Sequence, residues 1–239
     1  MGSLLADTRK SYIQLFNEVR RKLGVNEITT LGQDTLGMAM IDYMNDVIAE
    51  ISDFGDWQEM YREEAFAFVT ANSSTSDWVF NTSVATKNIH EIQFGNQIAP
   101  LWLVTLDNIR RLNRVKSYGV PTQFAFVGVD NATTGNPRVR VFPTPTTAQA
   151  SANFNVAYYK KPVLITTADT SSIPEFPSRM IAQGLLAYTL RDEERGAQSQ
   201  EWQDEYAIFK KFVGETYNRY NGDTGSDTFF VPPRGSRRR

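Results

Sequence analysis

The chain has 239 residues, with 25 lysine and arginine residues against 27 aspartate and glutamate residues, one histidine and no cysteine. Its length is enough to bury a sizeable core, and we expect one large domain or a core with an inserted module. The absence of cysteine excludes disulfides, thiol nucleophiles and cysteine zinc clusters, and a single histidine excludes sites that need several. The net charge of −2 is neither that of a polycation nor that of a strongly acidic protein.

The ends and the apolar runs give no sign of a membrane protein. The longest apolar run, residues 98–104, is seven residues long and contains a proline, whereas a membrane span needs about 20 residues. The first residues have neither a basic start nor a long apolar stretch, so they do not predict a secretory signal. We expect a chain that is made and kept in a cytoplasm, with no membrane partner.

Two helices are predicted at the start of the chain. Apolar residues recur at helical spacing over residues 12–23, and Gly24 ends the pattern. The second helix covers residues 34–53 and ends before Gly55, which is followed by Trp57. Its apolar stripe consists of Leu36, Met40, Met44, Val47, Ile48 and Ile51.

A β-rich zone follows, from about residue 61 to residue 165. Short segments rich in aromatic and β-branched residues, separated by turn-forming residues, predict its strands. These segments are residues 64–69, 77–80, 89–94, 98–104, 123–129 and 138–142. Residues 153–158 alternate between polar and apolar in the same way. A short helix over residues 106–114, with Thr105 as its N-cap, interrupts the zone.

The last third is helical again. Residues 180–190 are apolar nearly all round, which is typical of a helix surrounded by other helices. An amphipathic helix follows, with acidic residues in its first turns and basic residues later, as the helix dipole favours. Its apolar stripe consists of Trp202, Tyr206, Phe209, Val213, Tyr217 and Tyr220.

These elements predict an α+β fold. We expect a four-helix bundle formed by N- and C-terminal helical pairs, an inserted antiparallel β-rich module and an extended C-terminal arm. The two pairs would pack on each other because neither pair alone can cover its apolar stripes. The expected boundaries are residues 1–60 with 170–221 for the bundle, 61–169 for the insert and 222–239 for the arm.

Signs of catalysis are weak. No phosphate-binding loop, dinucleotide fingerprint or nucleophile elbow occurs in the sequence. The acidic run Asp192, Glu193 and Glu194 could supply carboxylates for glycoside hydrolysis, but adjacent acids point in different directions around a helix, as at a solvated helix end. His90 stands beside Glu91 in a predicted strand, without a nucleophile that the sequence can place. We expect no enzyme, no cofactor and no metal site.

The middle of the chain is basic. Residues 105–163 contain eight basic and two acidic residues. The candidate surface consists of Arg110, Arg111, Arg114, Lys116, Arg138 and Arg140. It could contact a nucleic acid backbone or a neighbouring subunit, or it could be a solvated edge whose charges discourage strand pairing.

The C-terminal residues combine aromatic and basic side chains. The residues concerned are Phe229, Phe230, Val231, Pro232, Pro233, Arg234, Arg237, Arg238 and Arg239. Exposed phenylalanines on a tail would favour aggregation unless the tail docks. We interpret the tail as an arm that binds a partner, with folding back on the chain's own core and disorder as the alternatives.

The order of elements resembles a known family. The segment 172–179, the apolar helix after it and the acidic start of the helix at residues 201–206 are similar to the C-terminal half of head-to-tail adaptor proteins of short-tailed bacteriophages, also called tail tubular or head–tail connector proteins. The N-terminal half agrees in layout, with a Leu-Gly turn at residues 31–32 and a second helix that ends near Trp57.

This resemblance implies a structural virion protein at the head–tail junction, made in the host cytoplasm. Such proteins form a ring, usually of twelve copies, beneath the portal vertex, and genomic double-stranded DNA passes through its lumen without any catalysed reaction. The implied partners are the portal protein, the downstream tail (nozzle) protein and other copies of the chain. A C-terminal segment reaches to the portal in these proteins. From the residues of the arm, we expect Phe229, Phe230 and Val231 to insert between portal subunits. Two alternatives are a sequence-independent nucleic-acid-binding protein and a tail-associated glycan hydrolase.

Overall fold

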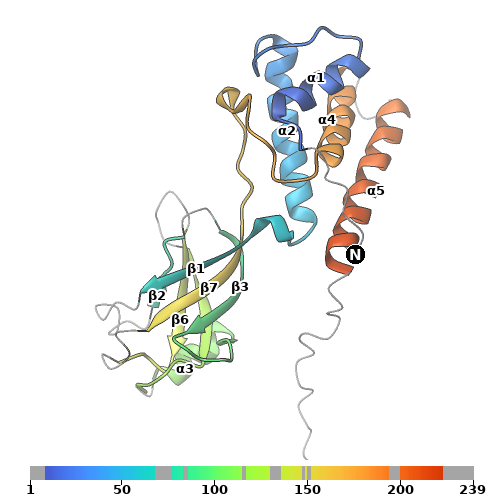
Figure 1. Ribbon diagram of the computed structural model, residues 1–239. Helices are drawn as coiled ribbons and strands as arrows, with labels where there is room; N and C mark the ends of the chain where they lie inside the picture. Colours follow the sequence, from blue (N-terminus) through green and yellow to red (C-terminus); the bar gives the residue numbers. More distant parts are fainter. Residues whose placement is uncertain are drawn as a thin grey trace, which may run out of the picture. The chain divides into compact units, whose positions relative to one another are not determined.

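The computed structural model describes residues 9–67, 77–82, 86–114, 117–129, 136–146, 149, 152–193 and 200–222 (Figure 1). The chain forms two compact units. One consists of two separate stretches, the first ending at Glu59 and the second beginning at Pro162, and the other consists of Met60–Lys161. We call these the helical unit and the β unit.

The described residues of the helical unit form four α-helices and a short 3-10 turn. The helices are α1 (Tyr12–Lys22), α2 (Thr35–Phe54), α4 (Ser178–Glu193) and α5 (Gln200–Gly222), and the turn is η4 (Thr167–Asp169). Each of α1, α2 and α5 packs against α4. The side chains of α4 that fill this core include Ile181 and Leu185, both fully buried.

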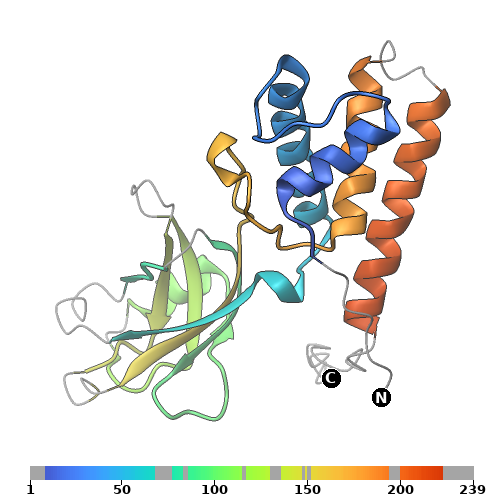
Figure 2. The same ribbon diagram turned by 45° about the horizontal axis from the view of Figure 1, so that its top comes forward.

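The predicted four-helix bundle of two terminal pairs is wrong. α1 has 11 residues and α2 has 20, and α1 lies across α2 and α4 rather than alongside them (Figure 2). The segment between α1 and α2 takes part in the core itself, since it buries Ile28 and Leu31. Both N-terminal helices therefore pack mainly on α4, and α4 is the centre of the unit because it is apolar nearly all round.

Arg20 holds α1, its following loop and α2 together. Its side chain is buried, and its guanidinium donates to the Asn26 carbonyl at 2.6 Å and to the Asp34 carboxylate at 2.6 and 3.1 Å. Asp34 is also the N-cap of α2 and accepts from the Gly37 N–H at 2.7 Å. One carboxylate thus caps a helix and neutralises a buried arginine.

In the β unit, the residues that the structure describes form two sheets. One has the order β1-β7-β3 and the other the order β2-β6-β5-β4. The strands are β1 (Tyr61–Ala67), β2 (Asp77–Val79), β3 (Thr86–Phe94), β4 (Trp102–Leu103), β5 (Gln123–Val129), β6 (Pro137–Phe142) and β7 (Asn153–Lys160). The predicted antiparallel module is wrong in one respect, because β4 pairs with β5 in parallel.

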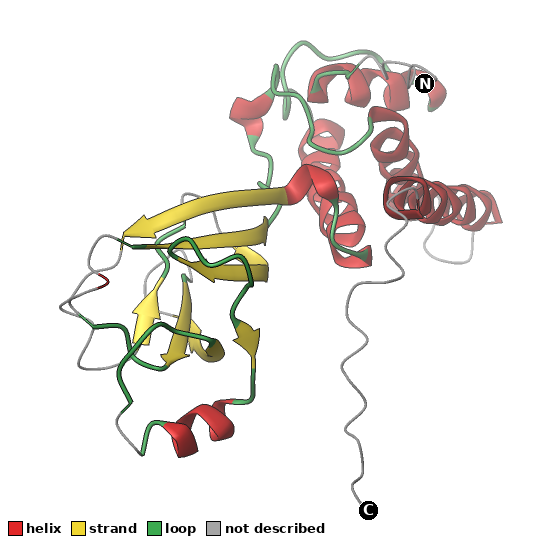
Figure 3. Cartoon of the chain, turned by 60° about the horizontal axis from the view of Figure 1, so that its bottom comes forward, coloured by secondary structure: helices red, strands yellow, loops and turns green. Residues whose placement is uncertain are grey.

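An aromatic-rich core lies inside the β unit. Phe154 of β7 contacts Trp78, Phe80 and Phe94, with ring centroids 4.8 to 5.6 Å apart. Because Trp78 belongs to β2, these contacts join the two sheets. The helix α3 (Leu106–Leu112) lies outside the strands (Figure 3) and packs on β5 and β6, where Ile109 and Ala125 are fully buried.

Candidate interaction surfaces

Helix α3 and the residues just after it carry the first group of predicted basic residues. Arg110 and Arg111 lie on α3 and Arg114 follows its end, and we call these three the α3 arginines. The N-cap of α3 is Thr105, whose hydroxyl accepts from the Asn108 N–H at 3.4 Å, as the sequence predicted. Arg110, Arg111 and Arg114 are all exposed, and Asp107 lies 3.8 Å from Arg110. Lys116 lies outside the described residues. The α3 arginines therefore form a solvent-facing basic surface on the β unit.

The second group of basic residues has a structural role. Arg138 and Arg140 of β6 lie opposite the short strand β2, and both donate to the carboxylate of Asp77 at 2.5 to 2.9 Å. The Asp77 side chain is only 7% exposed. The hydrogen bond to Asp77 raises the pKa of Arg140, with burial acting in the opposite direction. This carboxylate anchors β2 to β6, so the two arginines carry less uncompensated charge than the sequence suggested.

Most of the other predicted sites lie outside the described residues, and His90 lies within them. The C-terminal arm was expected at residues 222–239; Gly222 is the last residue of α5, and residues 223–239 lie outside the described residues, as do the side chains of Asp192, Glu193 and Glu194. His90 is exposed on β3, and its ring lies 6.3 Å from Tyr61 and 6.0 Å from Tyr159 between centroids. Contacts with two tyrosine rings do not make the nucleophile–histidine–carboxylate arrangement of a hydrolase.

An apolar sheet edge was not foreseen from the sequence. Trp102 and Leu103 are 60% and 61% exposed on β4, which ends its sheet. The Trp102 N–H donates to the Thr122 carbonyl and the Val104 N–H donates to the Phe124 carbonyl, both at 2.9 Å. The Leu103 N–H, which lies between them in the chain, therefore faces away from the sheet. Residues 98–104 were predicted as a strand. Whether a strand lies at the edge of a sheet depends on which other strands pair with it, and the strand's own residues do not show this.

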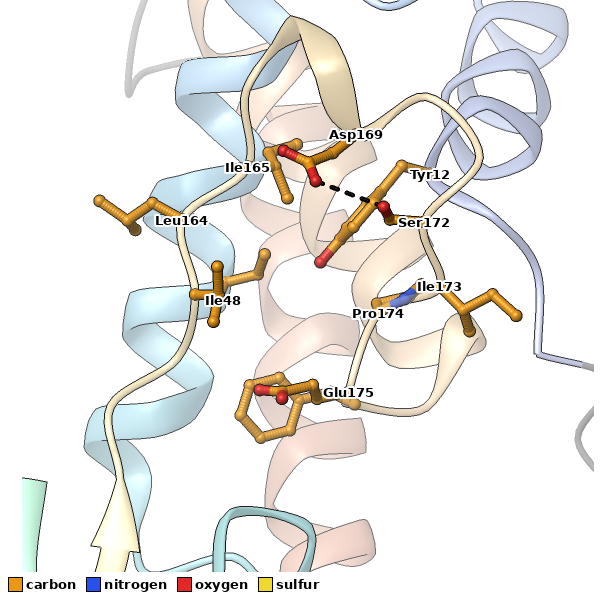
Figure 4. Close-up of a pocket in the computed structure, with 11 residues that line it drawn as sticks. Tyr12, Ile48, Leu164, Ile165, Asp169, Ser172, Ile173, Pro174 and Glu175 are labelled. Carbon is orange, nitrogen blue, oxygen red and sulfur yellow. Dashed lines mark hydrogen bonds between the residues drawn. The ribbon is translucent and has the colours of Figure 1, made fainter. Parts of the chain in front are cut away.

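A pocket of about 200 Å³ opens on the helical unit (Figure 4). Tyr12 of α1 and Ile48 of α2 enter it from two helices, and the rest of its lining comes from the segment between Pro162 and α4. That segment supplies Val163, Leu164, Ile165, Asp169, Ser172, Ile173, Pro174, Glu175 and Phe176.

Apolar side chains and carboxylates both line the pocket. The residues that line it include the buried Ile165 and Phe176, and its titratable side chains are Tyr12, Asp169 and Glu175, with no basic side chain. Burial, followed by the nearby Asp169 carboxylate, raises the pKa of Tyr12 to about 12, so the hydroxyl remains a hydrogen-bond donor at neutral pH. Its hydroxyl points toward the middle of the pocket (Figure 4).

Local hydrogen bonds shape one side of this pocket. Asp169 accepts from the Thr166 N–H and hydroxyl, both at 2.9 Å, and from the Ser172 hydroxyl at 3.3 Å. Hydrogen bonds from Thr166 hold the pKa of Asp169 below its usual range. The Tyr12 N–H donates to the Ser172 carbonyl at 3.0 Å, which fixes the segment on the start of α1.

Neither a metal site nor a membrane span is found in the described part of the chain. Its side chains include no group of three or more residues that could hold a metal ion. None of its helices is long and apolar enough to cross a membrane.

Comparison with known proteins agrees with the order of elements. A family model described as SU10 adaptor protein matches residues 10–228, which cover most of the chain and both units. No curated protein matches the chain. The predicted resemblance to head-to-tail adaptors is confirmed: the chain belongs to the SU10 adaptor protein family, a phage head-to-tail adaptor family.

Proposed function

We propose that this protein is the structural adaptor between the head and the tail of a phage, located at the head–tail junction of the virion. Copies would form a ring, with twelve as the expected number, that joins the portal protein to the downstream tail protein and lets genomic DNA pass. The observation that carries this proposal is the family match over residues 10–228, because it includes both units rather than one shared module. Catalysis has no place in the proposal.

The division into two units supports such a role. The helical unit has a core built around α4, which suits a wall element that keeps its shape. The β unit offers two unlike surfaces, the exposed arginines of α3 and the apolar edge at β4. A ring made of one kind of subunit needs two different, complementary surfaces on each copy.

The α3 arginines are proposed to contact the neighbouring copy in the ring. Replacing Arg110, Arg111 and Arg114 by glutamate should prevent ring formation on portal particles, because the reversed charges would meet an acidic surface with repulsion. Negative-stain imaging of the mixture measures this. Lys161→Glu, at an exposed lysine elsewhere on the β unit, serves as the control. If the triple variant forms normal rings, the α3 arginines do not take part in the contact between neighbouring copies.

The C-terminal arm is proposed to bind the portal. Its phenylalanines would insert between portal subunits, and its arginines would pair with carboxylates there. Removing residues 222–239 should abolish portal binding and leave a folded chain that still melts cooperatively, since the buried residues of α5, Phe209 and Val213, precede the cut. Sedimentation of the truncated chain with portal particles measures binding. Unchanged binding would contradict a role of the arm in docking.

The most direct test of the proposed function is to mix the purified protein with portal protein of the same phage and image the product. We expect a ring seated on the portal. If the two proteins do not associate under conditions in which both are folded, the adaptor proposal is wrong for this chain.

A further inference from the structure

The pocket between α1, α2 and the segment before α4 has the size of one aromatic side chain. Its volume is about 200 Å³, and an apolar cavity of roughly 150 Å³ is known to hold a benzene molecule. Three large apolar side chains that line it remain exposed, namely Val163 at 63%, Leu164 at 59% and Ile173 at 54%. Leu164 and Ile173 stand on opposite sides of the opening (Figure 4). Such a concentration of exposed apolar surface around a pocket indicates that a ligand covers it.

The lining also restricts the charge of the ligand. Asp169 and Glu175 are carboxylates at the pocket, and no lysine or arginine lines it. A ligand with an aromatic ring followed by basic groups would place the ring against Ile48 and Phe176 and its cations near the carboxylates. The chain itself contains such a sequence, since Phe229 and Phe230 are followed by Arg234 and the arginines at 237–239.

The end of α5 lies within reach of this pocket. The Trp57 ring contacts Phe176, which lines the pocket, and also Tyr217 of α5, with centroids 5.6 and 5.2 Å apart. Tyr217 precedes Gly222 by five residues, so the end of α5 is on the order of 20 Å from the pocket. The seven residues from Gly222 to Phe229 span up to about 23 Å when extended.

We propose that the pocket is a binding site for the chain's own C-terminal arm, with the ring of Phe229 or Phe230 inserted beside Ile48 and the arginines near Asp169. In the free subunit this contact shields the two phenylalanines from water. The inference stands apart from the adaptor function, because it concerns the single subunit before any partner binds.

A disulfide test is possible because the natural chain has no cysteine. In the full-length protein, Ile173→Cys at the pocket is combined with Thr228→Cys, which leaves both phenylalanines in place. After mild oxidation at low protein concentration, we expect most of the protein to carry an intramolecular disulfide, seen as a shift of the monomer band in a non-reducing gel. Adding Phe229→Ser and Phe230→Ser should reduce this product at least fivefold.

The matched control places the first cysteine on α5 instead. Ile208→Cys is also partly exposed, at 41%, and lies about 21 Å along the helix from Gly222, so the arm could reach it equally well. Combined with Thr228→Cys, it should give several-fold less intramolecular product. Equal cross-linking at both positions, or disulfide-linked dimers as the main product, would overturn the proposal. Portal binding of the cysteine-free protein is measured separately, so a negative result here leaves the adaptor proposal untouched.

Discussion

Replacing Glu50 by alanine is expected to lower the free energy of unfolding of the helical unit by about 3 kcal/mol. Glu50 lies on α2 and accepts hydrogen bonds from the hydroxyls of Tyr188 on α4, at 2.7 Å, and Tyr206 on α5, at 2.6 Å. Lys210 of α5 pairs with the same carboxylate. The variant would leave an ammonium and two hydroxyls without their acceptor in a site where the Glu50 side chain is only 19% exposed.

Urea denaturation followed by circular dichroism measures this change. Asp46→Ala is the matched control, because Asp46 lies four residues earlier on α2 and is exposed, so its loss should change the free energy by less than about 0.5 kcal/mol. If both variants lose the same stability, the carboxylate of Glu50 does not join the three helices.

The stabilisation by Glu50 should also depend on pH. Burial alone would raise the pKa of Glu50, but hydrogen bonds from Lys210, Tyr206 and Tyr188 outweigh it and hold the pKa below its usual range. A carboxyl whose pKa is lowered by folding stabilises the folded state above the unfolded pKa, which is about 4.3 for glutamate, and this contribution disappears as the pH falls through the folded value. The difference in the free energy of unfolding between the natural chain and Glu50→Gln should therefore be largest at pH 7 and shrink below about pH 4.3.

Local patterns predicted single elements well in this chain. The strand expected at residues 123–129 is β5, and the helix expected at residues 34–53 is α2, which runs from Thr35 to Phe54. Such elements follow from the spacing of apolar residues and from turn residues, both of which are local properties. The Thr105 N-cap was predicted for the same reason.

Contacts between distant segments could not be predicted in this way. Glu50 meets tyrosines that are 138 and 156 residues away, and Asp77 meets two arginines that are 61 and 63 residues away. Each residue alone is an ordinary polar residue in a helix or strand. The wrong helical bundle has the same cause, since apolar stripes show that helices need partners without showing which partners they have.

The candidate surfaces show the same limit. The α3 arginines were identified because they are close together in the sequence, with Arg110 and Arg111 on one short helix and Arg114 two residues beyond its end. The pocket could not be found, because Tyr12, Ile48 and the segment that begins at Val163 come from three separate parts of the chain. Exposed apolar residues such as Leu164 look like core residues until their surroundings are known.

The second large effect is expected at Gly184, in the middle of α4. A Cβ atom at this position would lie 2.7 Å from Cγ1 of Val47 on α2 and 2.8 Å from Cε2 of Phe209 on α5. Both neighbours are fully buried, so neither can move aside into solvent. Gly184→Ala should therefore lower the free energy of unfolding by about 1–3 kcal/mol, and Gly184→Leu by more than about 3 kcal/mol.

Gly214 of α5 is a matched control for the backbone effect. It is also a helical glycine, but the nearest atom to an added Cβ is Cζ of Phe54, at 3.9 Å, which is ordinary van der Waals contact. Gly214→Ala should raise the free energy of unfolding by about 0.5–1 kcal/mol, because alanine loses less backbone entropy in a helix. Thermal and urea denaturation of the two alanine variants give the sign of each change. The two variants should change the free energy of unfolding with opposite signs if α2 and α5 both approach the backbone of α4 closely at Gly184. Stabilisation by both variants would contradict the central position of α4.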